Sequence, residues 1–252
     1  MEITELEALI SRCLRDFHAR RIQTLNKLRF RTLLQRKNPY LLRALGTQKA
    51  SELVERLLSD YISGSDESIF GDAFFEPIAR IAAGARVSTR EGNDIVIETE
   101  NAIRVIAVKS GPNPYNASQK KRQSQEFIAI RHRLYKMQKE YDPILGHAYG
   151  RKNGPAGSDL IYRDSSGQSF WFELTGDQDF YLKLIRLMRD EPVKHREEYR
   201  PQWEAIINRF TKTFIEDFCD AQGNIQWEIL VRIVSETPKP KPPKTVQGMV
   251  KS

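Results

Sequence analysis

The apolar residues of this chain change their spacing once, between residues 91 and 109. Upstream they recur at helical intervals, as in Leu6, Ile10 and Leu14. In GNDIVIETENAIRVIAVK they alternate in two β-rich runs, residues 94–99 and 103–108, joined by a Glu-Asn-Ala turn. A helix-rich chain interrupted by one hairpin is expected to form a mixed α/β (α+β) fold: a short central mixed sheet flanked by helices, with helix-rich N- and C-terminal parts.

Helical patterns are predicted on both sides of the hairpin. Residues 3–35 have helical spacing, and the residues KNPY at 37–40 break it. A helix over residues 47–62, capped by Thr47 or Ser51, is followed by the sequence SGSDES, which predicts a turn. Further helices are predicted at residues 69–85, 120–137 and 175–188.

The composition favours one globular protein. The chain has 252 residues, of which 40% are hydrophobic, so it can bury a sizeable core. No window approaches the ~18 apolar residues of a membrane span, and the start MEITELEALI lacks the features of a signal peptide. We predict a cytoplasmic protein with a helical region at 1–36, a main domain at 37–234 and a disordered Pro/Lys-rich tail at 235–252.

Positive charge is concentrated between residues 104 and 139. Nine bases stand there against one acid, Glu126, which gives +8 in a chain whose net charge is +7. A solvated helix face usually mixes both signs, whereas a surface that binds a phosphate backbone does not. We predict contact with nucleic acid, in which Lys120, Lys121 and Arg122 take part.

The hairpin brings an acid and a base together. If paired residue numbers sum to 201, Asp94 is opposite Ala107, and if they sum to 203, it is opposite Lys109. In both registers Asp94, Ala107 and Lys109 share one face of the sheet, because side chains alternate with period 2. This is an arrangement for metal-dependent phosphodiester cleavage: the carboxylate holds a divalent cation, and the ammonium polarises water and offsets negative charge.

The order of acid, apolar strand and lysine resembles the PD-(D/E)xK nuclease core, and longer stretches resemble type II restriction endonucleases of the PmeII-like family. The similar stretches are KNPYLLRA (37–44), IFGDAFFEPIA (69–79), the Asp94 strand, VKSGPN with the following NASQ (108–119), HAYGR (147–151), GQSFWFELTGD (167–177) and IINRFTKTFIEDFCDAQGNIQWEILV (206–231). The resemblance implies a restriction-endonuclease-like fold and sequence-specific cleavage of double-stranded DNA with Mg2+ or Mn2+. It also implies a homodimer and a cognate DNA methyltransferase.

One position departs from the general nuclease pattern. The residue two before the lysine is usually acidic, and here it is Ala107. Glu98 lies four residues from Asp94, about 13 Å along the strand, too far to share one ion. The resemblance allows a carboxylate on the following helix, Glu126, and Glu76 corresponds to an acidic helix residue often found at such sites. We therefore predict Asp94, Glu76 and Glu126 as metal ligands and Lys109 as a catalytic residue.

Polar residues after Lys109 are candidates for contact with phosphate or water. They are Ser110, Asn113, Asn116, Ser118 and Gln119, although such residues also form turns. Residues 158–174 are interpreted as structural, either a second hairpin or a strand followed by a helix, with Trp171 and Phe172 in the core.

Two other functions stay open on the sequence alone. Ala107 is compatible with a non-catalytic nucleic-acid-binding protein that keeps a degenerate nuclease fold. A structure-specific repair nuclease would be distinguished by cutting that depends on the form of the DNA and not on its sequence. Retention of Asp94, Lys109 and the KSGPN loop favours the restriction endonuclease.

Overall fold

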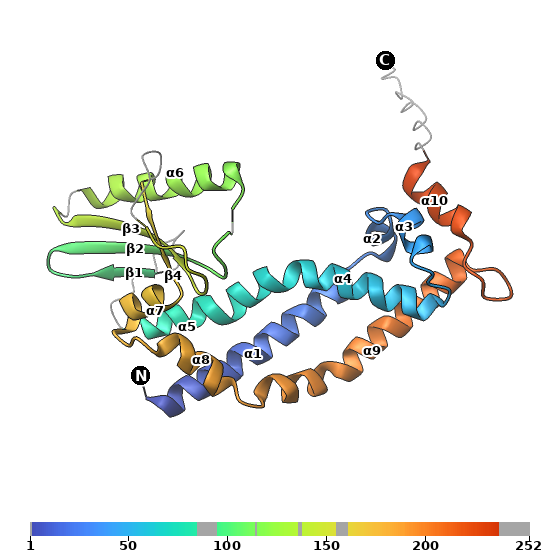
Figure 1. The fold of residues 1–252 in the computed structure, drawn as a ribbon, viewed down its shortest axis with the longest axis horizontal. Helices are drawn as coiled ribbons and strands as arrows, with labels where there is room; N and C mark the ends of the chain where they lie inside the picture. The colour runs from blue at the N-terminus through green and yellow to red at the C-terminus, as the bar shows by residue number, and fades with distance from the viewer. Residues whose placement is uncertain (1, 85–94, 114, 136–137, 155–160, 237–252) are drawn as a thin grey trace, which may run out of the picture. The chain divides into compact units, whose positions relative to one another are not determined.

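The computed structural model describes residues 2–84, 95–113, 115–135, 138–154 and 161–236 (Figure 1). Asp94 and the tail from residue 237 lie outside the described residues. The chain divides into two compact units: unit 1 contains Met1–Lys27 and Asp60–Ala205, and unit 2 contains Leu28–Ser59 and Ile206–Ser252. The domain boundaries predicted at residues 36 and 234 stay predictions.

Unit 1 contains a four-stranded mixed sheet in the order β1-β2-β3-β4. The strands are β1 (Ile95–Glu98), β2 (Ala102–Lys109), β3 (Glu140–His147) and β4 (Arg163–Ser166). β1 pairs with β2 as an antiparallel hairpin, whereas β2, β3 and β4 run parallel. The mixed α/β fold is confirmed.

The hairpin adopts one of the two predicted registers. Ile95 is opposite Ile106 and Glu98 is opposite Ile103, so paired numbers sum to 201. The register that sums to 203 is wrong. The short Glu-Asn-Ala turn fixes this pairing, because Thr99 accepts a hydrogen bond at Oγ1 from the amide of Ala102 and donates its own amide to the carbonyl of Ala102.

Helices cover both faces of the sheet. Ile103, Val105 and Ala107 of β2 point toward α6 (Ala117–Leu134), which contributes Phe127 and Ile130 to the same core. The alternate residues of β2 face a second core built from α1 (Ile3–Asn26), α5 (Glu76–Ala82) and α7 (Gln168–Thr175). Figure 1 shows these helices on the side of the sheet opposite α6. The helix predicted at 120–137 corresponds to α6, which ends at Leu134, and it returns over the hairpin, as the crossover between parallel β2 and β3 requires.

The N-terminal helices differ from the prediction at two places. One is the helix predicted over residues 47–62 with a cap at Thr47 or Ser51, which begins instead at Ala50, and the other is the SGSDES stretch. The N-terminal helices are α1 (Ile3–Asn26), α2 (Phe30–Leu34), α3 (Pro39–Ala44), α4 (Ala50–Phe70), the π-helix η1 (Gly71–Phe75) and α5 (Glu76–Ala82). The predicted turn at SGSDES is wrong, because α4 continues through it. Arg21 of α1 donates from Nε to Asp66 at 2.7 Å, and this tertiary contact outweighs the weak helix propensity of Ser and Gly.

The C-terminal half is helical after β4. It contains α7 (Gln168–Thr175), α8 (Phe180–Met188), α9 (Glu191–Phe218) and α10 (Trp227–Ser235). Residues 163–175 thus form a strand followed by a helix. Trp171 is buried as predicted and donates from Nε1 to the carbonyl of Ala148, but Phe172 is 44% exposed, so its placement in the core is wrong. Adjacent residues of a helix point about 100° apart, so only one faces the core.

No helix in the described part of the chain is long and apolar enough to cross a membrane.

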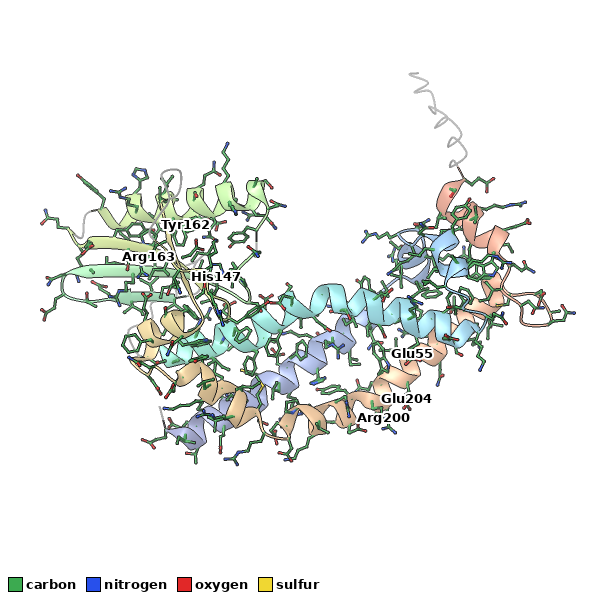
Figure 2. All side chains as sticks on the ribbon, viewed as in Figure 1. Glu55, His147, Tyr162, Arg163, Arg200 and Glu204 are labelled. Carbon is green, nitrogen blue, oxygen red and sulfur yellow. The ribbon has the colours of Figure 1, made fainter. Side chains whose placement is uncertain are left out.

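An ion-pair network joins β3, β4 and α7. Arg163 donates from Nε to Asp142 at 2.8 Å and from Nη2 to Glu173 at 2.6 Å (Figure 2 labels Arg163). Burial alone would raise the pKa of the Glu173 carboxyl group. The hydrogen bonds from Arg163 and from the hydroxyl of Ser165 outweigh burial, so this pKa is lowered.

The network predicts a pH-dependent contribution to stability. Glu173→Gln should lower the free energy of unfolding by about 2 kcal/mol at neutral pH, because it removes charge-assisted hydrogen bonds. Since the folded pKa of Glu173 is below its unfolded value, the stabilisation is present above about pH 4.3 and is lost as pH falls through the folded pKa. Urea unfolding of both proteins from pH 7 to pH 3 measures this, and a difference that is independent of pH would contradict it.

Candidate active site

Lys109 lies at the carboxyl end of β2. Its partner in the neighbouring parallel strand is His147, the last residue of β3. Lys109 is half-buried, and its Nζ lies 5.8 Å from the centre of the Tyr115 ring. Ligand sites of α/β proteins commonly lie outside the carboxyl ends of parallel strands, so this is the edge of the sheet where a site is expected.

A pocket of about 560 Å³ opens at this edge. Lys109 and Glu76 both line it, so the structure brings together two of the predicted site residues. Ser110 and Asn113 of the KSGPN loop also line it. The remaining lining residues come from α4, η1, the end of β2 and the segment after β3: Gly64, Glu67, Ser68, Gly71, Asp72, Val108, Gly111, Pro112 and Tyr149.

Two carboxylates of the pocket have hydrogen-bond partners. Glu67 accepts at Oε1 from the hydroxyl of Ser110 at 2.6 Å and from that of Tyr149 at 3.0 Å. The hydrogen bond from Tyr149 to Glu67 raises the pKa of the Tyr149 phenol above its ordinary value. The phenolate form could not donate this bond and would also repel the Glu67 carboxylate. Glu76 accepts at Oε1 from Arg80 at 2.7 Å. These hydrogen bonds therefore hold the carboxylate oxygens of Glu67 and Glu76 in fixed orientations in the pocket.

Glu67 and Tyr149 were missed by sequence reasoning. Glu67 belongs to the SGSDES stretch, whose predicted turn gave it no role, and Tyr149 lies 82 residues away in the chain. Gly111 shows how closely Tyr149 approaches the loop: a Cβ atom there would lie 2.6 Å from the tyrosine hydroxyl oxygen. A glycine in KSGPN was the only available signal of this approach.

The polar residues after the loop begin α6. Asn116 accepts at its side-chain oxygen from the amide of Gln119 at 3.0 Å and from the hydroxyl of Ser118 at 2.8 Å. The side chain of Gln119 in turn accepts from the amide of Asn116, which completes a capping box. These three residues are exposed, and their contact with DNA stays a prediction.

Glu126 lies apart from the residues that line the pocket. It is on α6, and its Oε1 is 3.1 Å from Nε of Arg122 in an i,i+4 ion pair. Gln123 of α6 is buried and accepts at 2.6 Å from the hydroxyl of Tyr115, the residue whose ring lies near Lys109. The Nε2 atom of Gln123 has no hydrogen-bond partner among the described residues.

Ala107 is buried within the core under α6. It is 4% exposed and packs in the same cluster as Phe127 and Tyr162. An ionised carboxylate at this position would have to leave water for an apolar environment, which is costly without a partner. The structure thus gives a physical reason why a small apolar residue fits here.

A histidine and an aspartate hold the loop that follows Lys109. His147 is fully buried, and Figure 2 labels it within the sheet region. Its Nδ1 lies 2.9 Å from the carbonyl oxygen of Gly111, and its Nε2 lies 2.7 Å from Oδ1 of Asp164. The buried ring thus links the loop carbonyl to the carboxylate of β4. Lys152 donates to the same Asp164 oxygen at 2.9 Å.

The described residues contain no group of three or more His, Cys, Asp or Glu side chains arranged to hold a metal ion. Asp94 lies outside them, so a site that includes Asp94 is untested. Oxygen donors such as Glu76 and Asp72 are the chemical type that Mg2+ prefers, and Mg2+ is commonly bound by only one or two carboxylates together with water and substrate phosphates. The donor set of the pocket is compatible with Mg2+.

A comparison with protein families identifies the chain. The model of the family described as Type II restriction endonuclease EcoO109I matches residues 4–197. The chain belongs to this family. A search of curated proteins found no match. The prediction of a type II restriction endonuclease is thus confirmed at the level of the family, whose members cleave DNA at specific sequences, and the narrower PmeII-like resemblance stays a prediction.

Proposed function

We propose that this chain of the EcoO109I family is a Mg2+-dependent endonuclease that hydrolyses phosphodiester bonds of double-stranded DNA at a specific sequence. The observation that carries the proposal is that Lys109 and Glu76 line one pocket at the carboxyl end of β2. An ammonium and a carboxylate in one water-accessible pocket are the groups that phosphodiester hydrolysis needs.

Lys109 orients the attacking water and offsets the negative charge that develops on the phosphate. Glu76 and Asp94 are the proposed ligands of Mg2+, which when bound supplies positive charge against the scissile phosphate. Ser110 and Asn113 follow Lys109 in the loop that His147 contacts at the carbonyl of Gly111. These two residues are proposed to position the phosphate. The pattern of acid and lysine supports assignment to the PD-(D/E)xK nucleases.

Glu126 is the alternative to Glu76 as the carboxylate ligand that acts beside Asp94. The observation against its role is that it pairs with Arg122 and does not line the pocket of Lys109 and Glu76. We therefore propose Glu76 as the principal helix carboxylate and keep Glu126 as the competing assignment.

The N-terminal part of α6 is proposed to bind the DNA backbone. Lys120, Lys121 and Arg122 are all exposed. Replacing all three with Ala should weaken binding to every DNA sequence alike and reduce the log-log dependence of affinity on salt by about 0.9 for each phosphate contact that is lost. Fluorescence anisotropy with a labelled duplex at several salt concentrations, in EDTA to prevent cleavage, measures the slope.

The matched control for this triple variant removes three cations from α9. Arg196, Arg200 and Lys212 are exposed and each lies in an ion pair with a glutamate. Replacing these three with Ala changes the net charge equally and should leave the salt dependence nearly unchanged. An equal reduction of the slope in both triple variants would show that the α6 cations act only through the overall charge of the protein.

Digestion of a fully sequenced plasmid tests the proposed function directly. With Mg2+ or Mn2+ we expect discrete fragments whose ends map to one short sequence, and EDTA should prevent cutting. Because such sequences are usually palindromic and both strands are cut, we also propose a homodimer and a methyltransferase that protects the host sequence. Binding without cutting in any divalent ion would instead support the non-catalytic protein, and cutting that follows DNA form would support a repair nuclease.

A further inference from the structure

A second run of positive charge lies in unit 2. Residues 28–49 contain six cations and no acid. This density, +6 in 22 residues, exceeds the +8 in 36 residues of the segment around α6. The six cations are Arg29, Arg31, Arg36, Lys37, Arg43 and Lys49.

The apolar residues of this segment face inward, so its charges face solvent. Phe30 of α2 stacks on Phe210 of α9 with ring centres 5.0 Å apart and meets Phe214 edge-on at 6.2 Å. Leu33 and Leu42 are also buried. Five of the six cations are exposed, and Lys37 is the exception, with intermediate exposure.

The helix α9 shows how an ordinary solvated face of this protein is built. Its exposed cations alternate with acids, as in the pairs Arg200–Glu204 and Lys212–Glu216 (Figure 2 labels Arg200 and Glu204). Such i,i+4 pairs keep a surface helix soluble without accumulating charge. The 28–49 segment has no acid of its own to form them, so solubility alone does not account for its composition.

Two of the cations are engaged within unit 2. Arg31 lies 3.0 Å from Asp217, and the guanidinium of Arg43 lies over the ring of Trp227 at 5.6 Å. Arg29, Arg36 and Lys49 are exposed and form no ion pair with any described residue. They are available to an external anion.

Large apolar side chains are exposed among these cations. Tyr40 and Leu41 of α3 are 68% and 54% exposed, and Leu45 is 48% exposed. An aromatic ring between basic side chains is typical of surfaces that contact both the phosphates and the sugars of nucleic acid.

We propose that residues 28–49 form a second DNA-binding surface, which holds the phosphate backbone of duplex DNA through Arg29, Arg36 and Lys49. The proposal rests on the proposed function for the identity of the polyanion. It adds a binding surface in a compact unit that contains neither Lys109 nor Glu76. Contact with phosphates fixes the position of the duplex and raises affinity without reading its sequence.

The test replaces Arg29, Arg36 and Lys49 with Ala and measures binding to labelled duplex DNA in EDTA at several salt concentrations. Three lost phosphate contacts should reduce the slope of log affinity against log salt by about 2.7, and they should weaken binding to cognate and non-cognate duplexes alike. The control is again the α9 triple variant with Ala at Arg196, Arg200 and Lys212, which should keep the wild-type slope. Circular dichroism and thermal unfolding check that both variants are folded.

The outcomes separate this inference from the proposed function. Wild-type protein that fails to bind duplex DNA at low salt would overturn the proposed function. Wild-type protein that binds normally, with no change of slope in the Arg29, Arg36 and Lys49 variant, would overturn the second surface alone. So would an equal change in the α9 control, or a change of oligomeric state by sedimentation with the slope preserved, which would assign the segment to a protein interface.

Discussion

Lys109→Ala is expected to reduce DNA cleavage by about 10³-fold while affinity for DNA stays within a few-fold of wild type. Lys109 is half-buried at the carboxyl end of β2, where its positive charge can act on a reacting phosphate. The other charged residues that line the described pocket are acids, so none of them could take over this role. Lys109→Arg should recover only a small part of the rate, because the guanidinium is larger and cannot occupy the position of the compact ammonium.

Single-turnover cleavage of a labelled duplex, with protein in excess, measures the chemical step without product release. Asp94→Ala should be as severe, since it removes a proposed metal ligand. The control is Lys212→Ala on α9, an exposed lysine that should leave the rate unchanged. A Lys109→Ala protein that cuts within about tenfold of wild type would show that the assigned site is wrong.

The hairpin was predictable because two strands with period 2 are joined by a short turn, but its register was only narrowed to two pairings, of which the structure adopts one. The third strand was not predicted, although it is central. β3 contains Pro143, and proline argues against a strand between two neighbours because it cannot donate a ladder hydrogen bond. The structure accommodates it because β4 pairs with β3 only from Ile144 onward.

The site could be predicted only where the chain itself carried the signal. Lys109 ends an apolar strand and could be named from that pattern, whereas Glu76, on the helix before the hairpin, was named from the resemblance to nucleases. The hydrogen bonds of Glu67 with Ser110 and Tyr149 join residues 43 and 82 positions apart. The buried contact between His147 and Asp164 likewise depends on the pairing of β3 with β4, which no local pattern indicated.

Glu76→Gln is expected to reduce cleavage by about 10²-fold or more and to raise the Mg2+ concentration needed for half-maximal activity, whereas Glu126→Gln should leave both within a few-fold of wild type. The reason is position: Glu76 lines the pocket of Lys109, and Glu126 is on α6 in an exposed pair with Arg122. Gln keeps the size of each side chain and removes the charge that a divalent cation requires.

The ion pair between Glu76 and Arg80 supplies the control for this prediction. Arg80→Ala removes one partner of Glu76 but leaves its carboxylate, so a purely structural role of this ion pair would make Arg80→Ala as harmful as Glu76→Gln. A metal-binding role predicts instead that Arg80→Ala keeps most of the activity, since an i,i+4 pair at the surface stabilises a helix by only about 0.5 kcal/mol. Severe loss in Glu126→Gln with normal activity in Glu76→Gln would reverse the assignment and place the helix carboxylate that binds the metal on α6.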